Sequence, residues 1–159
     1  MVMPNTPPLT LRTSQRSGDY EAILRMHQAL YDYGPEFDRY VADTLRTFYA
    51  SYNPERECVW LAQDGDKVVG SIVLKETEGW AQLRYFLIQP EYRGRGLGKL
   101  MMEAFTAFRD AAGYTKSFLL TEEQLETAAA LYEKHGYQFV SHTPMDFGLV
   151  ELRYEWHHG

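Results

Sequence analysis

Residues 92–102 read YRGRGLGKLMM and place three glycines at alternate positions. The preceding residues, 80–88, are rich in aromatic and branched apolar side chains, which is typical of a strand. The apolar residues that follow have the three- and four-residue spacing of a helix over 97–108. The sequence therefore predicts a strand, a glycine-rich turn and a helix in direct succession.

This glycine turn is suited to binding a phosphate or pyrophosphate. Alternate glycines let backbone N–H groups approach a ligand closely, and a helix dipole adds positive potential at the same point. The glycines are Gly94, Gly96 and Gly98, and the basic residues beside them are Arg93, Arg95 and Lys99. A tight turn with solvated arginines is the competing interpretation, so the detailed form of the motif has to decide.

Two common phosphate motifs do not fit this spacing. The dinucleotide fingerprint would need its third glycine at Lys99. The P-loop would need a glycine at Arg93 and a serine or threonine at Leu100. The pattern that remains is Arg-x-x-Gly-x-Gly, formed by Arg93, Gly96 and Gly98.

The rest of the chain predicts an α/β (α+β) fold. We expect helices over residues 20–31, 37–49, 97–108 and 125–132, and strands over 9–13, 58–62, 68–74, 80–88, 117–120, 137–141 and 149–156. This order indicates one mixed, mostly antiparallel sheet of six to seven strands with helices on both faces. We expect a single domain over residues 9–156, a disordered lead over 1–8 and a short tail over 157–159.

Composition excludes several classes of protein. With 159 residues, 45% hydrophobic and 14% aromatic, the chain has the composition of a folded soluble domain. Its one cysteine, Cys58, excludes an internal disulfide and a multi-thiolate zinc site, and the scattered histidines predict no metal. The net charge of −6 argues against nucleic acid. No apolar stretch approaches a membrane span or a signal peptide, so we expect a cytoplasmic protein without a membrane partner.

The glycine motif, after a strand ended by Pro90, resembles motif A of the GNAT family of N-acetyltransferases. Residues 128–137, AAALYEKHGY, resemble the family's A-x-x-L-Y-E-K-x-G-[FY] motif. The resemblance covers about residues 58–154. Residues 80–137 look most like the acetyltransferase half of MarR-type fusion proteins, without their DNA-binding half.

The resemblance implies that acetyl-CoA is the co-substrate. The pyrophosphate would bind the glycine turn, and the pantetheine arm would pair with the strand edge, in a splay between the fourth and fifth strands. The residues that the resemblance assigns to the coenzyme are Phe86, Leu87, Ile88, Arg93, Gly94, Arg95, Gly96, Leu97, Gly98, Lys99, Ala128 and Tyr132.

The resemblance also implies catalytic roles. Tyr132 would protonate the departing thiolate, although its apolar helical spacing also fits simple packing against the sheet. A backbone N–H near Leu87 or Ile88 would hold the oxyanion. Gln82 stands where relatives often carry a glutamate base, so the base is left to a water chain or to Glu76 or Glu78.

Leu125 stands where many members of the family carry an asparagine that contacts the coenzyme. Leucine can only pack, so some hydrogen bonding to the pantetheine arm is not expected here.

The resemblance implies that the acceptor pocket is built by the loop between the first two helices and by the late hairpin, which are residues 31–37 and 142–150 here, both aromatic and acidic. Aromatic walls with acidic groups suit a cationic or aromatic amine, and a solvated acidic loop is the competing interpretation. We expect a primary amine of a small molecule or amino acid, acetylated by direct attack in a ternary complex, with a protein N-terminus or lysine as the rival acceptor. A non-catalytic acyl-CoA sensor and a nucleic-acid-binding module are the two competing functions. A homodimer would form through the sheet edge or the late hairpin.

Overall fold

The computed structural model describes residues 9–122, 126–145 and 149–159. Its seven strands form one sheet in the order β1-β2-β3-β4-β5-β7-β6. The strands are β1 (Leu9–Arg12), β2 (Cys58–Asp64), β3 (Lys67–Thr77), β4 (Trp80–Ile88), β5 (Lys116–Glu122), β6 (Gln138–Pro144) and β7 (Val150–His157). The helices are α1 (Asp19–Leu30), α2 (Pro35–Ala50), α3 (Leu97–Ala111) and α4 (Glu126–Lys134), with a 3-10 turn, η1 (Pro90–Tyr92), before the glycines. This confirms the predicted α/β class and the mixed sheet.

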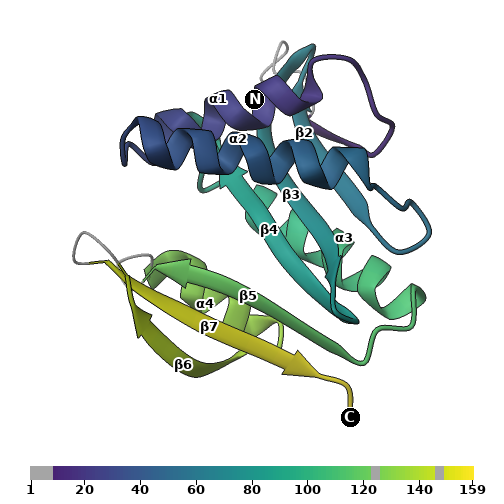
Figure 1. Cartoon of the computed structure of the whole chain (residues 1–159). Coiled ribbons are helices and arrows are strands. Elements are labelled where there is room, and N and C mark those ends of the chain that lie inside the picture. The colour runs from purple at the N-terminus through teal and green to yellow at the C-terminus, as the bar shows by residue number, and fades with distance from the viewer. Residues whose placement is uncertain (1–8, 123–125, 146–148) are drawn as a thin grey trace, which may run out of the picture.

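The sheet opens between β4 and β5. These two strands pair in parallel over only three positions, Ala81–Leu83 against Ser117–Leu119, whereas every other neighbouring pair is antiparallel. Figure 1 shows the two strands side by side at one end and diverging toward the other. The remainder of β4, Arg84–Ile88, has no strand partner on its β5 side. The predicted splay between the fourth and fifth strands is therefore present.

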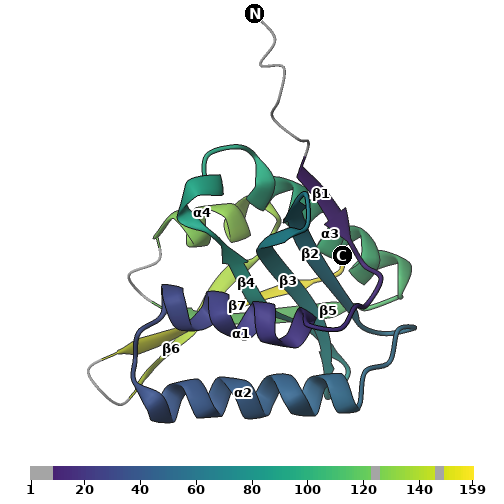
Figure 2. The same ribbon diagram turned by 90° about the horizontal axis from the view of Figure 1, so that it is seen from above.

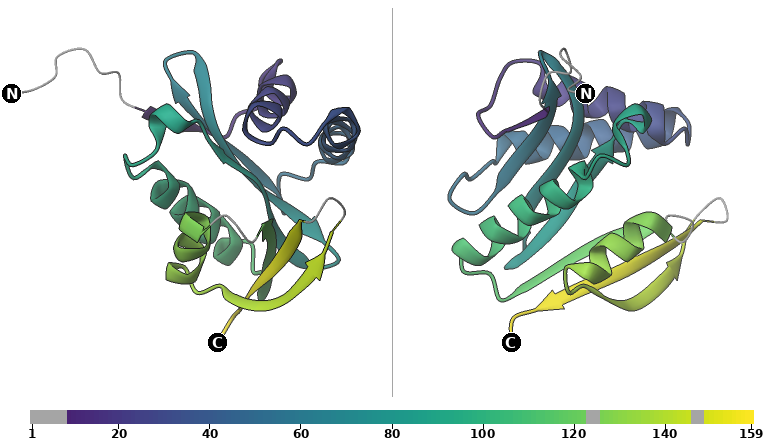
Figure 3. Two further views of the ribbon diagram at one scale, coloured as in Figure 1. Left: turned by 90° about the vertical axis from the view of Figure 1, so that its left-hand side faces the viewer. Right: turned by 180° about the vertical axis from the view of Figure 1, so that it is seen from behind.

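Helices cover both faces of the sheet. Helices α1 and α2 lie side by side on one face (Figure 2), and α3 and α4 lie on the opposite face (Figure 3). Each face has its own apolar core: Ile23 and Phe48 pack against Val73 on the first, and Met101 and Phe105 belong to the second. The apolar spacing read from the sequence thus marks the buried side of each helix.

A bulge in β4 helps to direct this strand away from β5. Two residues, Tyr85 and Phe86, together oppose Ile72 of β3. Tyr85 has a positive φ of 49°, and its carbonyl oxygen accepts a hydrogen bond of 2.6 Å from Ser71 Oγ. A bulge bends its strand and increases the local twist, so the extra residue favours divergence from a parallel neighbour.

A few elements differ from the sequence-based expectation. The turn η1 was not expected, and it forms because Pro90 ends the ladder and is compatible with a helical first position. Strand β7 runs to His157, one residue past the expected end of the strand at Trp156, and the His158 N–H donates to Thr115 O at 2.9 Å. The expected disordered lead, 1–8, and Leu125 lie outside the described residues.

None of the described helices is both long and apolar enough to cross a membrane.

Candidate active site

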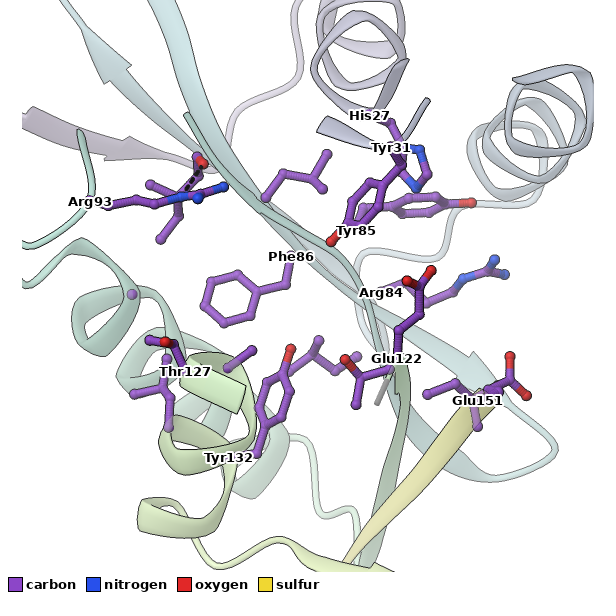
Figure 4. Close-up of a pocket in the computed structure, with 18 of the residues that line it drawn as sticks. His27, Tyr31, Arg84, Tyr85, Phe86, Arg93, Glu122, Thr127, Tyr132 and Glu151 are labelled. Atoms are coloured by element: carbon purple, nitrogen blue, oxygen red, sulfur yellow. Dashed lines mark hydrogen bonds between the residues drawn. The ribbon is translucent and has the colours of Figure 1, made fainter. Parts of the chain in front are cut away.

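The splay holds a cleft of about 850 Å³. Its walls come from β4, the glycine turn, α4, the end of β5 and the α1–α2 connection, as Figure 4 shows. All but two of the residues assigned to the coenzyme line it: Phe86, Leu87, Ile88, Arg93, Gly94, Gly96, Leu97, Gly98, Ala128 and Tyr132. The structure therefore brings together two motifs that are about thirty residues apart in the sequence.

The glycine turn exposes backbone donors to this cleft. Gly94 and Gly96 have φ values of 76° and 78°, and a Cβ on either would meet no atom within 4 Å. Gly96 is the N-cap of α3 without any side-chain cap, and the first turn of α3 has no acidic residue. The first N–H groups of a helix have no intrahelical acceptor, and the dipole makes this end positive. The donors and the open space beside them fit a pyrophosphate.

Gly98 has a different role from the other two glycines. A Cβ at this position would lie 3.3 Å from Leu131 Cδ2 and 3.5 Å from Ile88 Cδ1. It therefore allows the start of α3 to pack closely against both α4 and β4. This contact holds the two sequence motifs at a fixed separation across the cleft.

Arg95 and Lys99 are not among the residues that line the cleft. The Arg95 guanidinium lies 5.1 Å from the centroid of the Tyr92 ring. Lys99 Nζ lies 3.9 Å from Glu103 on the exposed face of α3, and 73% of its side chain is exposed. Both residues are exposed, and their assignment to the coenzyme stays a prediction that rests on the resemblance.

The free edge of β4 supplies the donor and acceptor for an extended ligand. The Gln89 N–H donates to Val69 O at 2.9 Å, so Gln89 faces β3. Neighbouring residues of an antiparallel strand turn their peptide groups to opposite edges, so the N–H of Ile88 faces the splay and that of Leu87 faces β3. Arg93 Nε donates to Ile88 O at 3.2 Å, which agrees with this orientation. Of Leu87 and Ile88, the two residues considered for holding the oxyanion, Ile88 is favoured because its N–H faces the splay.

Tyr132 extends from α4 toward the centre of the cleft (Figure 4). Its residue is only 5% exposed, and its ring lies 6.1 Å from Phe86 and 6.2 Å from Tyr154 between centroids. Burial raises the pKa of the Tyr132 hydroxyl, with smaller contributions from Tyr31, Tyr137 and Tyr154. The hydroxyl is therefore protonated at neutral pH, as a general acid must be before it donates.

The acids that the sequence suggested as bases are not in the cleft. Glu76 Oε2 accepts hydrogen bonds from Arg56 Nε at 2.7 Å and from the Tyr114 hydroxyl at 3.1 Å, and the Arg56 contact lowers the pKa of Glu76. Glu78 lies in the exposed β3–β4 turn. Gln82 does line the cleft, and its Oε1 accepts a hydrogen bond of 2.8 Å from Thr77.

Two carboxylates that the sequence analysis did not select line the cleft, Glu122 and Glu151. They are register partners across β5 and β7. The hydroxyl of Tyr33 donates to Glu122 Oε2 at 2.6 Å. The signal that would have found Glu122 is positional: it ends a strand at the carboxyl edge of a parallel pair, where α/β sheets bind ligands.

Aromatic side chains close the end of the cleft toward α1 and α2. His27 lies 4.8 Å from Tyr31 and 5.6 Å from Phe37 between ring centroids. Burial lowers the pKa of His27 to about 4, so the imidazole is neutral and contributes to an uncharged wall. Both predicted acceptor segments line the cleft, through Tyr31 and Phe37 in one and Met145, Leu149 and Val150 in the other. Asp146, in the second segment, lies outside the described residues.

The fold and the cleft together define an α/β domain with a cleft along an open strand edge, next to a helix N-terminus that is suited to a phosphate. Residues 55–139 match the model of the acetyltransferase (GNAT) domain family, and the chain belongs to this family. It is 28% identical over 104 residues to N-acetyltransferase family 8 member 3 of Rattus norvegicus, an alignment that covers 62% of this chain and 44% of that protein. The chain spans about half the length of the mammalian relatives that it matches.

Solved structures agree on the fold. An acetyltransferase from Streptococcus agalactiae matches with a TM-score of 0.76 at 20% identity, over 94% of this chain and 98% of that one. A putative streptothricin acetyltransferase from Bacillus anthracis, solved in complex with acetyl coenzyme A, matches with a TM-score of 0.58 at 19% identity, over 65% of this chain and 64% of that one.

Proposed function

We propose that this protein is an acetyl-CoA-dependent N-acetyltransferase that acetylates a primary amine of a small molecule or amino acid. One observation carries the proposal: the open edge of β4, the uncapped start of α3 and the Tyr132 hydroxyl line a single cleft. A pyrophosphate and an extended amide-bearing arm need these features in this order. Membership of the GNAT family and the complex of one structural neighbour with acetyl coenzyme A support the choice of ligand.

In this proposal the chain's own residues bind and orient the coenzyme. The N–H groups of the glycine turn and the start of α3 would hold the pyrophosphate, and the free edge of β4 around Phe86 would pair with the pantetheine arm. The coenzyme supplies an acetyl thioester when bound. The N–H of Ile88 faces the same space and would stabilise negative charge on the thioester oxygen.

Two side chains would handle protons during direct attack in a ternary complex. An alkylammonium has a pKa near 10, so removing its proton at pH 7 costs about 4 kcal/mol. Among the described residues, Glu122 and Glu151 are the carboxylates that line the cleft, and Glu122 is on β5, the strand that borders the splay. We assign Glu122 as the base, acting directly or through a water, and Tyr132 as the acid for the departing thiolate.

The first experiment tests coenzyme binding by thermal unfolding with and without acetyl-CoA. A ligand at 100 times its Kd stabilises a protein by about 2.7 kcal/mol. For a domain of this size each kcal/mol raises the midpoint by roughly 2–4 °C. We therefore expect a rise of about 5–10 °C with acetyl-CoA and none with ATP or NAD. An unchanged midpoint with saturating acetyl-CoA would contradict the proposed function.

A second experiment tests the acid. Tyr132→Phe is expected to lower kcat by at least about tenfold, because the general acid is lost, while the midpoint shift with acetyl-CoA stays the same. Tyr154→Phe is the matched control, since Tyr154 is equally buried and in ring contact with Tyr132 but does not line the cleft. Equal rates for Tyr132→Phe and the native protein would remove this role.

The alternative functions and acceptors remain predictions, and each can be tested with the same purified protein. Acetyl-CoA binding without thiol release over a broad panel of amines would favour the non-catalytic sensor, and transfer to peptides alone would favour a protein N-terminus or lysine as acceptor. The resemblance to MarR-type fusions, the cytoplasmic location and the homodimer also stay predictions. Binding to duplex DNA, measured at low and high salt, would test the nucleic-acid-binding module.

A further inference from the structure

Arg84 differs from the other sheltered arginines of this protein. Those that are partly or fully buried in the described residues each have a carboxylate partner, except Arg84. The pairs are Arg12–Asp19, Arg56–Glu76, Arg109–Asp110 and Arg153–Glu155, with N–O distances of 2.7, 2.7, 3.0 and 2.7 Å. No ion pair or side-chain hydrogen bond joins Arg84 to any residue within 9–122, 126–145 or 149–159.

The fold holds Arg84 in the cleft. Arg84 immediately precedes the β4 bulge and is the register partner of Val73, which places it on the sheet face toward α1 and α2. Its guanidinium lies 4.9 Å from the centroid of the Tyr85 ring, and Arg84 lines the cleft wall. Sheltering a guanidinium without a partner is unfavourable, so such a group is typical of a site where a ligand supplies the anion.

The cleft thus has an arginine at each end. Figure 4 shows Arg93 at the end near the glycine turn and Arg84 at the opposite end, with Phe86 between them. The first end fits the phosphates of the coenzyme. Arg84 instead shares its end with Glu122 and Glu151 and with the aromatic wall around Tyr31. The end of the cleft that holds Arg84, which we call the acceptor end, therefore presents both a cation and carboxylates.

We infer that Arg84 binds a carboxylate of the acceptor, so that the acceptor is a free amino acid rather than a simple amine or polyamine. The ammonium of such a zwitterion would lie toward Glu122, and its carboxylate would accept two parallel hydrogen bonds from the planar guanidinium. This inference rests on the proposed function for the direction of acetyl transfer. The pairing of Arg84 with an anionic ligand stands on the cleft alone.

The test compares L-amino acids with their α-carboxamides, which keep the amine and side chain but lose the negative charge. Thiol release with acetyl-CoA is measured for each pair. The native protein is expected to prefer the acid in kcat/KM by at least about tenfold, the effect of one charge-assisted hydrogen bond. Arg84→Gln is expected to raise KM for the acid roughly 10- to 100-fold while leaving KM for the amide unchanged.

Two variants sharpen this test. Arg84→Lys keeps the charge but loses the planar fork, so it should retain part of the preference for the acid. Arg153→Gln removes an arginine on β7 that does not line the cleft, and it should leave the preference intact. Equal use of acid and amide by the native protein, or an acid preference that survives in Arg84→Gln, would overturn the inference.

Binding measurements separate this inference from the proposed function. Arg84→Gln should keep the full midpoint shift with acetyl-CoA, and loss of that shift would place Arg84 in the coenzyme site and overturn the inference. If the native protein shows no shift with acetyl-CoA, the proposed function fails. Calorimetric titration with N-acetyl amino acids and their amides, without coenzyme, then still decides whether Arg84 binds a carboxylate. Tighter binding of the acids that is lost in Arg84→Gln supports the carboxylate site. Equal binding of acids and amides by the native protein excludes it.

Discussion

Gly96→Val is expected to abolish the stabilisation by acetyl-CoA and to reduce turnover below detection. Gly96 has a φ of 78°, and a side chain on it would extend into open space beside the start of α3. That space is where the pyrophosphate would lie against the helix N–H groups, so a branched side chain would exclude it. Differential scanning fluorimetry with increasing acetyl-CoA measures the effect directly.

Backbone strain has to be separated from loss of the site. Valine at a left-handed position costs about 1–3 kcal/mol wherever it stands. Gly113→Val is the matched control, because Gly113 has a φ of 82°, has no atom within 4 Å of a Cβ and follows the other end of α3. Both variants should lose intrinsic stability to a similar degree, but only Gly113→Val should respond to acetyl-CoA. Normal coenzyme affinity in a folded Gly96→Val protein would place the coenzyme elsewhere.

Glu122→Gln is expected to lower kcat/KM at pH 7 by about 100-fold or more, the usual contribution of a general base. The glutamine is nearly the same size and can still accept the hydrogen bond from Tyr33, so the local structure should persist. Because the amine has a pKa near 10, a growing fraction of it loses its proton without help as pH rises. The difference between the variant and the native protein should therefore narrow from pH 7 toward pH 10.

Glu151→Gln separates a positioned base from simple negative charge. It removes one carboxylate from the same cleft, on the strand that faces Glu122 in register. We expect a smaller loss of kcat/KM and a difference from the native protein that does not narrow at high pH. If both variants lose the same activity with the same pH profile, the carboxylates act through charge alone, and Glu122 is not the base.

Most residues that line the cleft beside the glycine turn were predictable from local sequence. The glycine turn, Tyr132 and the strand over 80–88 are each recognisable from neighbouring residues, and the structure places them in one cleft. The sequence shows that Arg95 and Lys99 stand beside the glycine motif, but it does not show that both residues lie outside the cleft wall. The same limit applies to Glu76, which binds Arg56 on another part of the surface.

The sequence by itself determined the elements, their order and the phosphate-suited turn, because periodicity, glycine and proline act over a few residues. Only the tertiary structure decided which distant side chains meet at the acceptor end. Arg84, Glu122 and Tyr31 come from three separate elements, and they converge because β4 pairs with β5 over three residues and then diverges. That divergence depends on a bulge and on two helix layers packing at once, which no local pattern specifies.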